Sequence, residues 1–122
     1  MYKQLTIAIA ALGCATAVLA HDTATGIVKE RMDGMVVLSK AMKTVLAETQ
    51  SAAPNPDVIK QAAQAMQDHA GDTMTKRFPK GSLDHPSEAT EAIWQDWDRF
   101  TFLASQLDLK AKGLALAAAN PI

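Results

Sequence analysis

Residues 93–122 read IWQDWDRFTFLASQLDLKAKGLALAAANPI, and this stretch decides the fold. Apolar residues recur in it at steps of three and four, which is the period of an α-helix. The stripe consists of Ile93, Trp97, Phe100, Ala104, Leu107, Ala111, Leu114 and Ala118. A helix with such a stripe must bury it against another element. The stretch therefore predicts a long helix, from about residue 91 to 118, that packs inside a helical assembly.

The composition favours the same fold class. The 122 residues are enough for one domain, and 48% of them are hydrophobic, many of these being alanine. Val and Ile are sparse, whereas Ala, Met, Lys, Gln and Glu are plentiful, a mixture that favours helices over strands. The formal net charge is −1, so no basic excess points to nucleic acid or to an anionic membrane surface as a partner.

The first twenty residues are typical of a cleaved export signal. Lys3 supplies the positive start, residues 5–19 are apolar, and small side chains near Ala20 predict cleavage before His21. A membrane anchor is the alternative, but about 20 apolar residues are needed to span a bilayer, and this run is shorter and carries two threonines. Lipidation at Cys14 is a further alternative. Cys14 is the only cysteine, so the exported chain has no disulfide and no thiolate metal site.

The exported part, residues 21–122, reads as one bundle of three helices, at about 27–47, 56–76 and 91–118. Asn55-Pro56-Asp57 is a strong start for the second helix: a capping side chain, a proline in the first turn and then an acid. Gly34 costs the first helix about 1 kcal/mol relative to alanine, which suggests a close approach to its backbone. Short connections make neighbouring helices antiparallel, so we expect an all-α, up-down bundle.

No residue constellation for catalysis is visible. The exported chain has no cysteine nucleophile, no G-x-S-x-G and no glycine-rich phosphate loop, so we do not expect an enzyme. His69 is a candidate haem or metal ligand, although a partly exposed surface histidine is the commoner case. His85 lies in a loop without an obvious co-ligand. His21, as a new N-terminus, has the amine and imidazole that chelate Cu(II).

Five methionines lie at helical spacing on the first two helices. They are Met32, Met35, Met42, Met66 and Met74. Thioethers fill irregular gaps in cores, and they also pack well against a flat hydrophobic cofactor. Spacing alone leaves both interpretations open, with core packing favoured.

Three stretches together resemble the cytochrome c′ family. IVKERM at 27–32, followed by Met35 and Met42, is similar to the first helix of that family. FPKGS at 78–82 is similar to its loop after the second helix, and AIWQDWDRF at 92–100 is similar to the start of its third helix. The order and spacing of these matches cover nearly the whole exported chain.

The resemblance implies an exported, periplasmic four-helix bundle that carries a covalent c-type haem with a histidine ligand to the iron. It implies a role in electron transfer to a redox partner, or in binding nitric oxide or carbon monoxide. It also implies a homodimer through the first two helices. No nucleic acid is expected as a partner, and no membrane after signal cleavage.

Six positions are implied to contact the haem: Arg31, Met32, Met35, Ser87, Glu88 and Trp94. Arg31 corresponds to the family's propionate-binding arginine, and Met32 stands where a glutamine is common. Met35 corresponds to the residue that projects over the distal face of the haem. Ser87 or Glu88 falls near the loop position that contacts a propionate.

One departure from the family pattern concerns the haem attachment itself. The family carries C-x-x-C-H on a fourth helix, and the 122 residues contain no such motif. We therefore expect a shortened member in which this chain cannot attach haem covalently or supply the usual axial histidine. The alternatives are a haem-free helical interaction module that uses the groove beside the three helices, or a loosely bound haem with His69 as ligand.

Overall fold

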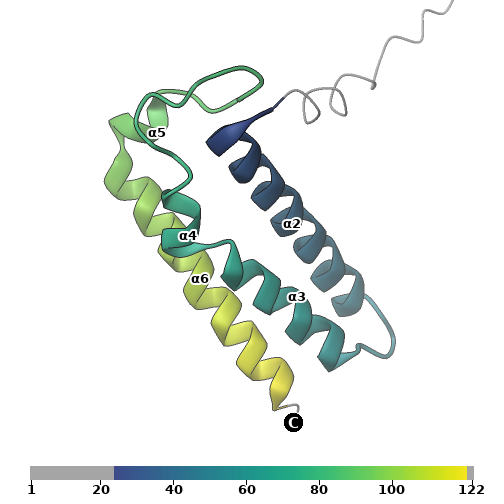
Figure 1. Ribbon diagram of the computed structural model, residues 1–122. Helices are drawn as coiled ribbons and strands as arrows, with labels where there is room; N and C mark the ends of the chain where they lie inside the picture. Colours follow the sequence, from purple (N-terminus) through teal and green to yellow (C-terminus); the bar gives the residue numbers. More distant parts are fainter. Residues whose placement is uncertain (1–23, 121–122) are drawn as a thin grey trace, which may run out of the picture.

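A computed structural model describes residues 24–120, and helices are the only regular elements in this range (Figure 1). The described residues form five helices in the order α2 (Gly26–Thr49), α3 (Pro56–Asp68), α4 (Gly71–Thr75), α5 (Ala92–Gln95) and α6 (Trp97–Ala119). The predicted export signal (1–20), Cys14 and His21 lie outside the described residues. The predicted all-α fold is confirmed.

Three long helices make an up-down bundle in which α3 is the central member (Figure 1). Helix α3 packs extensively against α6 on one side and against α2 on the other, whereas α2 and α6 hardly touch each other. The predicted start of α3 is confirmed. The side-chain oxygen of Asn55 accepts hydrogen bonds from the backbone N–H groups of Asp57 (3.0 Å) and Val58 (3.4 Å), and Pro56 occupies the first turn.

The segment 56–76, expected as one helix, is interrupted near Ala70. Gly71 has a positive φ of 55°, a conformation that ends a regular helix and that glycine adopts without strain. A Cβ there would make an ordinary van der Waals contact, at 3.5 Å, with the side chain of Asp108 on α6, so the backbone conformation is the reason for the glycine. After this bend, α4 packs against α6. The third predicted helix is likewise divided, at Asp96, into the short α5 and the long α6.

The core between the helices is built from small side chains. Its central cluster joins Ala41 of α2, Ala62 and Met66 of α3, and Ala111 of α6. Alanines at these positions let the helix backbones approach closely, and Met66 fills the remaining space. All eight residues of the predicted stripe on the last helix are buried or half-buried, so the stripe packs against α3, α4 and the adjoining loop as its period requires.

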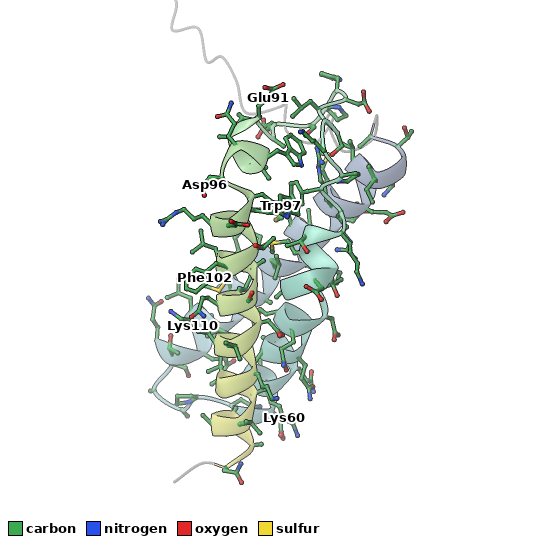
Figure 2. All side chains as sticks on the ribbon, turned by 90° about the vertical axis from the view of Figure 1, so that its left-hand side faces the viewer. Lys60, Glu91, Asp96, Trp97, Phe102 and Lys110 are labelled. Atoms are coloured by element: carbon green, nitrogen blue, oxygen red, sulfur yellow. The ribbon has the colours of Figure 1, made fainter. Side chains whose placement is uncertain are left out.

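Several large apolar side chains of α2 and α6 remain exposed. They are Met35, Val36, Met42 and Leu46 on α2, and Phe102, Leu103, Leu109 and Leu116 on α6. Figure 2 shows Phe102 and Lys110 projecting from α6 on the side away from α3. The described residues thus form an open bundle and not a sealed one. Within residues 24–120, no helix combines the length and the apolar character that crossing a membrane requires.

Candidate functional site

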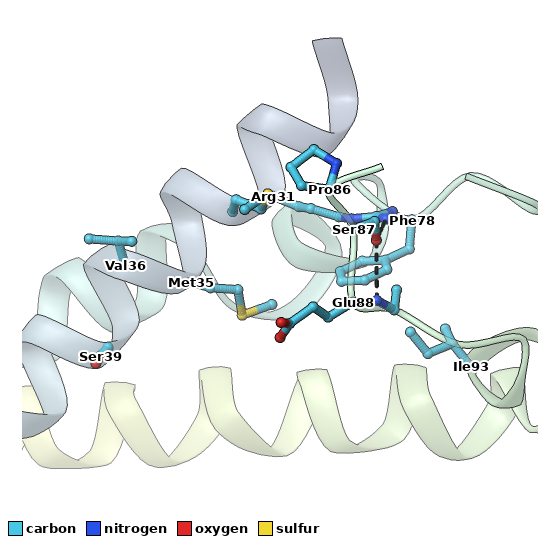
Figure 3. Close-up of a pocket in the computed structure, with 11 residues that line it drawn as sticks. Arg31, Met35, Val36, Ser39, Phe78, Pro86, Ser87, Glu88 and Ile93 are labelled. Atoms are coloured by element: carbon cyan, nitrogen blue, oxygen red, sulfur yellow. Dashed lines mark hydrogen bonds between the residues drawn. The ribbon is translucent and has the colours of Figure 1, made fainter. Parts of the chain in front are cut away.

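A pocket of about 460 Å³ opens beside the first turns of α2 (Figure 3). Its other walls are the loop between α4 and α5 and the start of α5. The lining residues are Arg31, Met32, Met35, Val36, Ser39, Phe78, Pro86, Ser87, Glu88, Ala89 and Ile93. Most of these contribute carbon and sulfur atoms, so the wall suits a largely apolar ligand with a polar edge near Arg31 and Ser87.

The guanidinium of Arg31 organises the polar edge of the pocket. Its Nη1 donates to Ser82 Oγ (2.7 Å) and lies 3.5 Å from the carbonyl oxygen of Arg77. Its Nη2 donates to the carbonyl oxygen of Ser82 (2.5 Å) and to Ser87 Oγ. One side chain on α2 therefore contacts the beginning, the middle and the end of the loop between α4 and α5.

The positive charge of Arg31 is buried, and no carboxylate of the described chain lies within salt-bridge distance of it. The side chain is only 4% exposed, and within the described part of the chain the one ion pair joins Lys29 to Asp33. Burial lowers the pKa of Arg31 below its usual value, and the charge of Asp84 opposes this effect. A guanidinium nevertheless stays protonated in proteins. A buried cation without an anion is costly, so this edge of the pocket favours a negatively charged group.

An aromatic cluster lies behind the guanidinium. The Arg31 guanidinium carbon lies 4.8 Å from the centre of the Phe78 ring, a cation–π geometry. Phe78 meets Phe100 edge to face, with ring centres 4.9 Å apart, and the Trp97 ring lies 5.4 Å from that of Phe100. Phe100 and Trp97 of α6 thus support Phe78, the member of the cluster that lines the pocket.

The part of the pocket wall that belongs to α2 also carries Met35. Figure 3 shows the thioether of Met35 and the carboxylate of Glu88 extending toward each other across the opening. Met35 is 40% exposed, so its flexible side chain is free to change rotamer within the pocket.

The comparison with family models decides the identity of the fold. The model described as Cytochrome C' matches residues 26–121, which is most of the chain. The chain belongs to the cytochrome c′ family. No curated protein and no solved structure matched it. Cytochromes c′ are haem proteins of electron transfer or gas binding and are typically periplasmic, so the cofactor that the family implies is haem.

Five of the six positions singled out from the cytochrome c′ resemblance line this one pocket: Arg31, Met32, Met35, Ser87 and Glu88. The sixth, Trp94, does not line it. The indole Nε1–H of Trp94 donates to the carbonyl oxygen of Phe78 at 3.0 Å, so this side chain supports a wall residue from behind.

Six wall residues were not singled out as contacts, namely Val36, Ser39, Phe78, Pro86, Ala89 and Ile93. Phe78 and Ile93 stand inside the two sequence stretches that carry the family resemblance, so a signal for them was present. The other four had no such signal, because only the folding of the loop beside α2 brings them to the same opening.

The pocket fits a haem ring in part. Its apolar wall suits the flat face of the ring, and Arg31 with Ser87 suits the carboxylate edge. None of the residues that line it is a histidine or a cysteine, so the wall supplies neither an iron ligand nor a thioether. Among residues 24–120, no group of three metal-binding side chains comes together either.

His69 lines a separate small pocket beside Gly34, next to the main opening. Its Nδ1 is 3.0 Å from Arg77 Nη1, and both groups lie over Gly34, where an added Cβ would stand 2.3 Å from the arginine nitrogen. The close approach expected at Gly34 is thus confirmed, and the group that approaches is the side chain of Arg77. His69 does not line the 460 Å³ pocket, so the structure gives no support to a haem ligand at this position.

Proposed function

We propose that the pocket beside Arg31 is the distal and propionate-side wall of a haem site, and that the protein acts as a periplasmic electron-transfer or gas-binding cytochrome c′. The observation that carries this proposal is the buried guanidinium at the edge of an apolar pocket, with no carboxylate of the described chain paired to it. A ligand with a flat apolar body and carboxylates at one edge satisfies both features.

Each part of the wall has a task in this proposal. Met35, Phe78 and Ile93 pack against the ring and exclude water from its face. Arg31, Ser87 and Glu88 border the polar edge, where the cation offsets the carboxylate charge. Haem, when bound, supplies a redox-active iron with a position for a small gas ligand. Met35 lies on the side of the pocket where this gas ligand would bind, so its side chain would limit the size of the ligand.

Blocking the pocket tests the proposal directly. Ser39 is exposed, lines the pocket and makes no side-chain hydrogen bond in the structure, so Ser39→Trp would fill the space at little cost to the fold. Haemin and metal-free protoporphyrin are titrated into the full chain, with absorbance and fluorescence as readouts. We expect saturable binding of both, weakened at least about tenfold by Ser39→Trp. Ser105→Trp, on the exposed side of α6, is the matched control and should bind as the unmodified chain does.

The use of both probes separates ring binding from iron ligation. Binding of protoporphyrin with the same affinity as haemin would mean that the wall alone holds the ring. Absence of binding by the unmodified chain, or equal binding by the Ser39→Trp variant, contradicts the proposed site.

We further propose a homodimer through α2 and α3. A shallow groove of about 300 Å³ runs along these two helices, lined by small and aliphatic residues such as Val37, Ala41, Val58 and Ala65. Sedimentation of the unmodified chain should give the mass of a dimer, and Ala65→Arg should shift it to the monomer. A dimer that persists in Ala65→Arg would place the interface elsewhere.

A haem-free interaction module is the second candidate function. The exposed apolar side chains of α2 and α6 favour it, because they are more than the single, scattered apolar residues of an ordinary protein surface. Under this alternative, Leu109→Lys on α6 would abolish association while haemin has no effect on it. Saturable haemin binding that is unaffected by Leu109→Lys favours the first function.

A further inference from the structure

We infer that Arg31 is a positioning residue, whose guanidinium holds the loop between α4 and α5 against α2 and thereby shapes the pocket before any ligand arrives. The three residues that it contacts are 46, 51 and 56 positions away in the sequence. The loop itself has only short turns, such as the bonds from Ser82 N to the Pro79 carbonyl and from Ser87 N to the Asp84 carbonyl. Long-range attachment of this segment therefore depends on few groups.

The donor count of the guanidinium supports this role. An arginine has five N–H donors, and the two terminal nitrogens supply four of them. All four are directed to loop oxygens, and the contact toward the Arg77 carbonyl is the longest, at 3.5 Å. Only Nε–H has no partner in the described chain. A ligand carboxylate could therefore gain a bidentate contact with Arg31 only by displacing serine oxygens of the loop.

The two serine hydroxyls complete the clamp. Ser87 Oγ accepts from Arg31 and also from the backbone N–H of Ala89 (3.1 Å), so it fixes the turn that carries Glu88 and Ala89 into the pocket wall. Ser82 offers both its hydroxyl and its carbonyl to the same guanidinium. Losing these contacts would free the loop that forms one wall of the pocket.

Limited proteolysis of the ligand-free chain tests the clamp by itself. Lys80 is exposed on this loop, so trypsin cleavage between Lys80 and Gly81, mapped by mass spectrometry, reports how often the loop opens. We expect Arg31→Lys and the double variant S82A/S87A to be cut there at least about tenfold faster than the unmodified chain. Arg99→Lys, at an exposed position of α6, is the matched control and should be cut at the original rate.

Folding is monitored by far-ultraviolet circular dichroism, because Arg31→Lys keeps a buried charge with fewer hydrogen bonds. The S82A/S87A variant keeps the arginine, so it tests the clamp even if Arg31→Lys does not fold. Cleavage at Lys80 that is unchanged in the folded S82A/S87A variant would overturn the inference.

A second measurement separates a clamp from a direct ligand contact, and it rests on the proposed haem function. The S82A/S87A variant removes two loop acceptors and leaves the cation in place. If Arg31 acts by positioning the loop, haemin binding weakens in this variant, and haemin dimethyl ester, which lacks the carboxylates, loses affinity to the same degree. If Arg31 pairs directly with a carboxylate, the freed donors maintain or tighten haemin binding and leave the ester unaffected. The latter result would overturn the inference.

The proteolysis experiment and the haemin-binding experiment test separate claims. Absence of haemin binding by the unmodified chain removes the proposed function, while accelerated cleavage at Lys80 still establishes the clamp. Normal haemin binding with unchanged cleavage removes the clamp and leaves the haem site standing.

Discussion

The indole of Trp94, on α5, donates a 3.0 Å hydrogen bond to the carbonyl oxygen of Phe78, at the start of the loop that closes the pocket. The aromatic ring of Phe78 also faces the guanidinium of Arg31, on α2. Phe78 is therefore held by α5 through its backbone and by α2 through its ring. This double attachment aligns the two sequence stretches that carry the family resemblance, FPKGS and AIWQDWDRF, side by side.

Trp94→Phe tests this attachment. The ring volume is partly kept while the donor is lost, so a half-buried carbonyl remains without its partner. We expect the free energy of unfolding to fall by about 1 kcal/mol, measured by urea denaturation. Trp97→Phe, which removes no hydrogen bond present in the structure, is the control for the change in ring size. Equal losses in the two variants would show that the hydrogen bond contributes nothing.

Phe100→Ala tests the aromatic cluster that supports Phe78. Phe100 is half-buried and touches both Phe78 and Trp97. Its removal forfeits apolar burial and two aromatic contacts, so we expect a loss of about 2–3 kcal/mol in the free energy of unfolding. Phe102→Ala on the exposed side of the same helix should change it by less than about 0.5 kcal/mol. Thermal and urea denaturation of both variants check the contrast.

Asn55→Ala tests the start of α3. The change removes the oxygen that accepts from the Asp57 and Val58 N–H groups. We expect a loss of about 1 kcal/mol in stability, and recovery of most of it in Asn55→Asp, which keeps an acceptor at the same position. A stable Asn55→Ala variant would mean that Pro56 and the packing of α3 suffice to define the helix start.

Gly34 offers a test of the close contact on α2. A Cβ at this position would meet Arg77 Nη1 at 2.3 Å and His69 Nδ1 at 3.2 Å. Both atoms belong to side chains that can move, and alanine improves helix propensity by about 1 kcal/mol. We therefore expect Gly34→Ala to change stability by less than about 1 kcal/mol, although it breaks the Arg77–His69 contact. Gly34→Val, with two further methyl groups and weaker helix propensity, should cost more than about 2 kcal/mol.

Much of the fold followed from local sequence. The stripe at 93–118, the cap at Asn55 and the glycine at position 34 each have a local physical cause, namely helix period, orphan N–H groups and a missing side chain. The helix interruptions near Ala70 and at Asp96 were not predicted from the local sequence. They depend on how α4 and α5 pack on α6, which no local pattern records.

The candidate site, too, could be predicted from the sequence only in part. Motif resemblance brought Arg31, Met35, Ser87 and Glu88 together on one pocket, because residues that share a task recur at fixed positions in related chains. It assigned Trp94 a place beside them, whereas the folded chain uses that indole to hold the Phe78 carbonyl. It assigned Arg31 to a haem propionate, which stays a prediction, and it did not indicate that the terminal donors of Arg31 are directed to loop oxygens.

The sequence by itself determined that this chain forms helices, about where α2, α3 and α5 begin, which face the last long helix buries and which family the chain belongs to. Those properties depend on periodicity, caps and short motifs, all of which act within a few residues of the chain. Only the tertiary structure decided that α2 and α6 stay apart, that apolar side chains remain exposed on both, and that Arg31 contacts a loop some fifty residues away. The reason is that packing and hydrogen bonds between distant segments depend on the positions that all the helices take together.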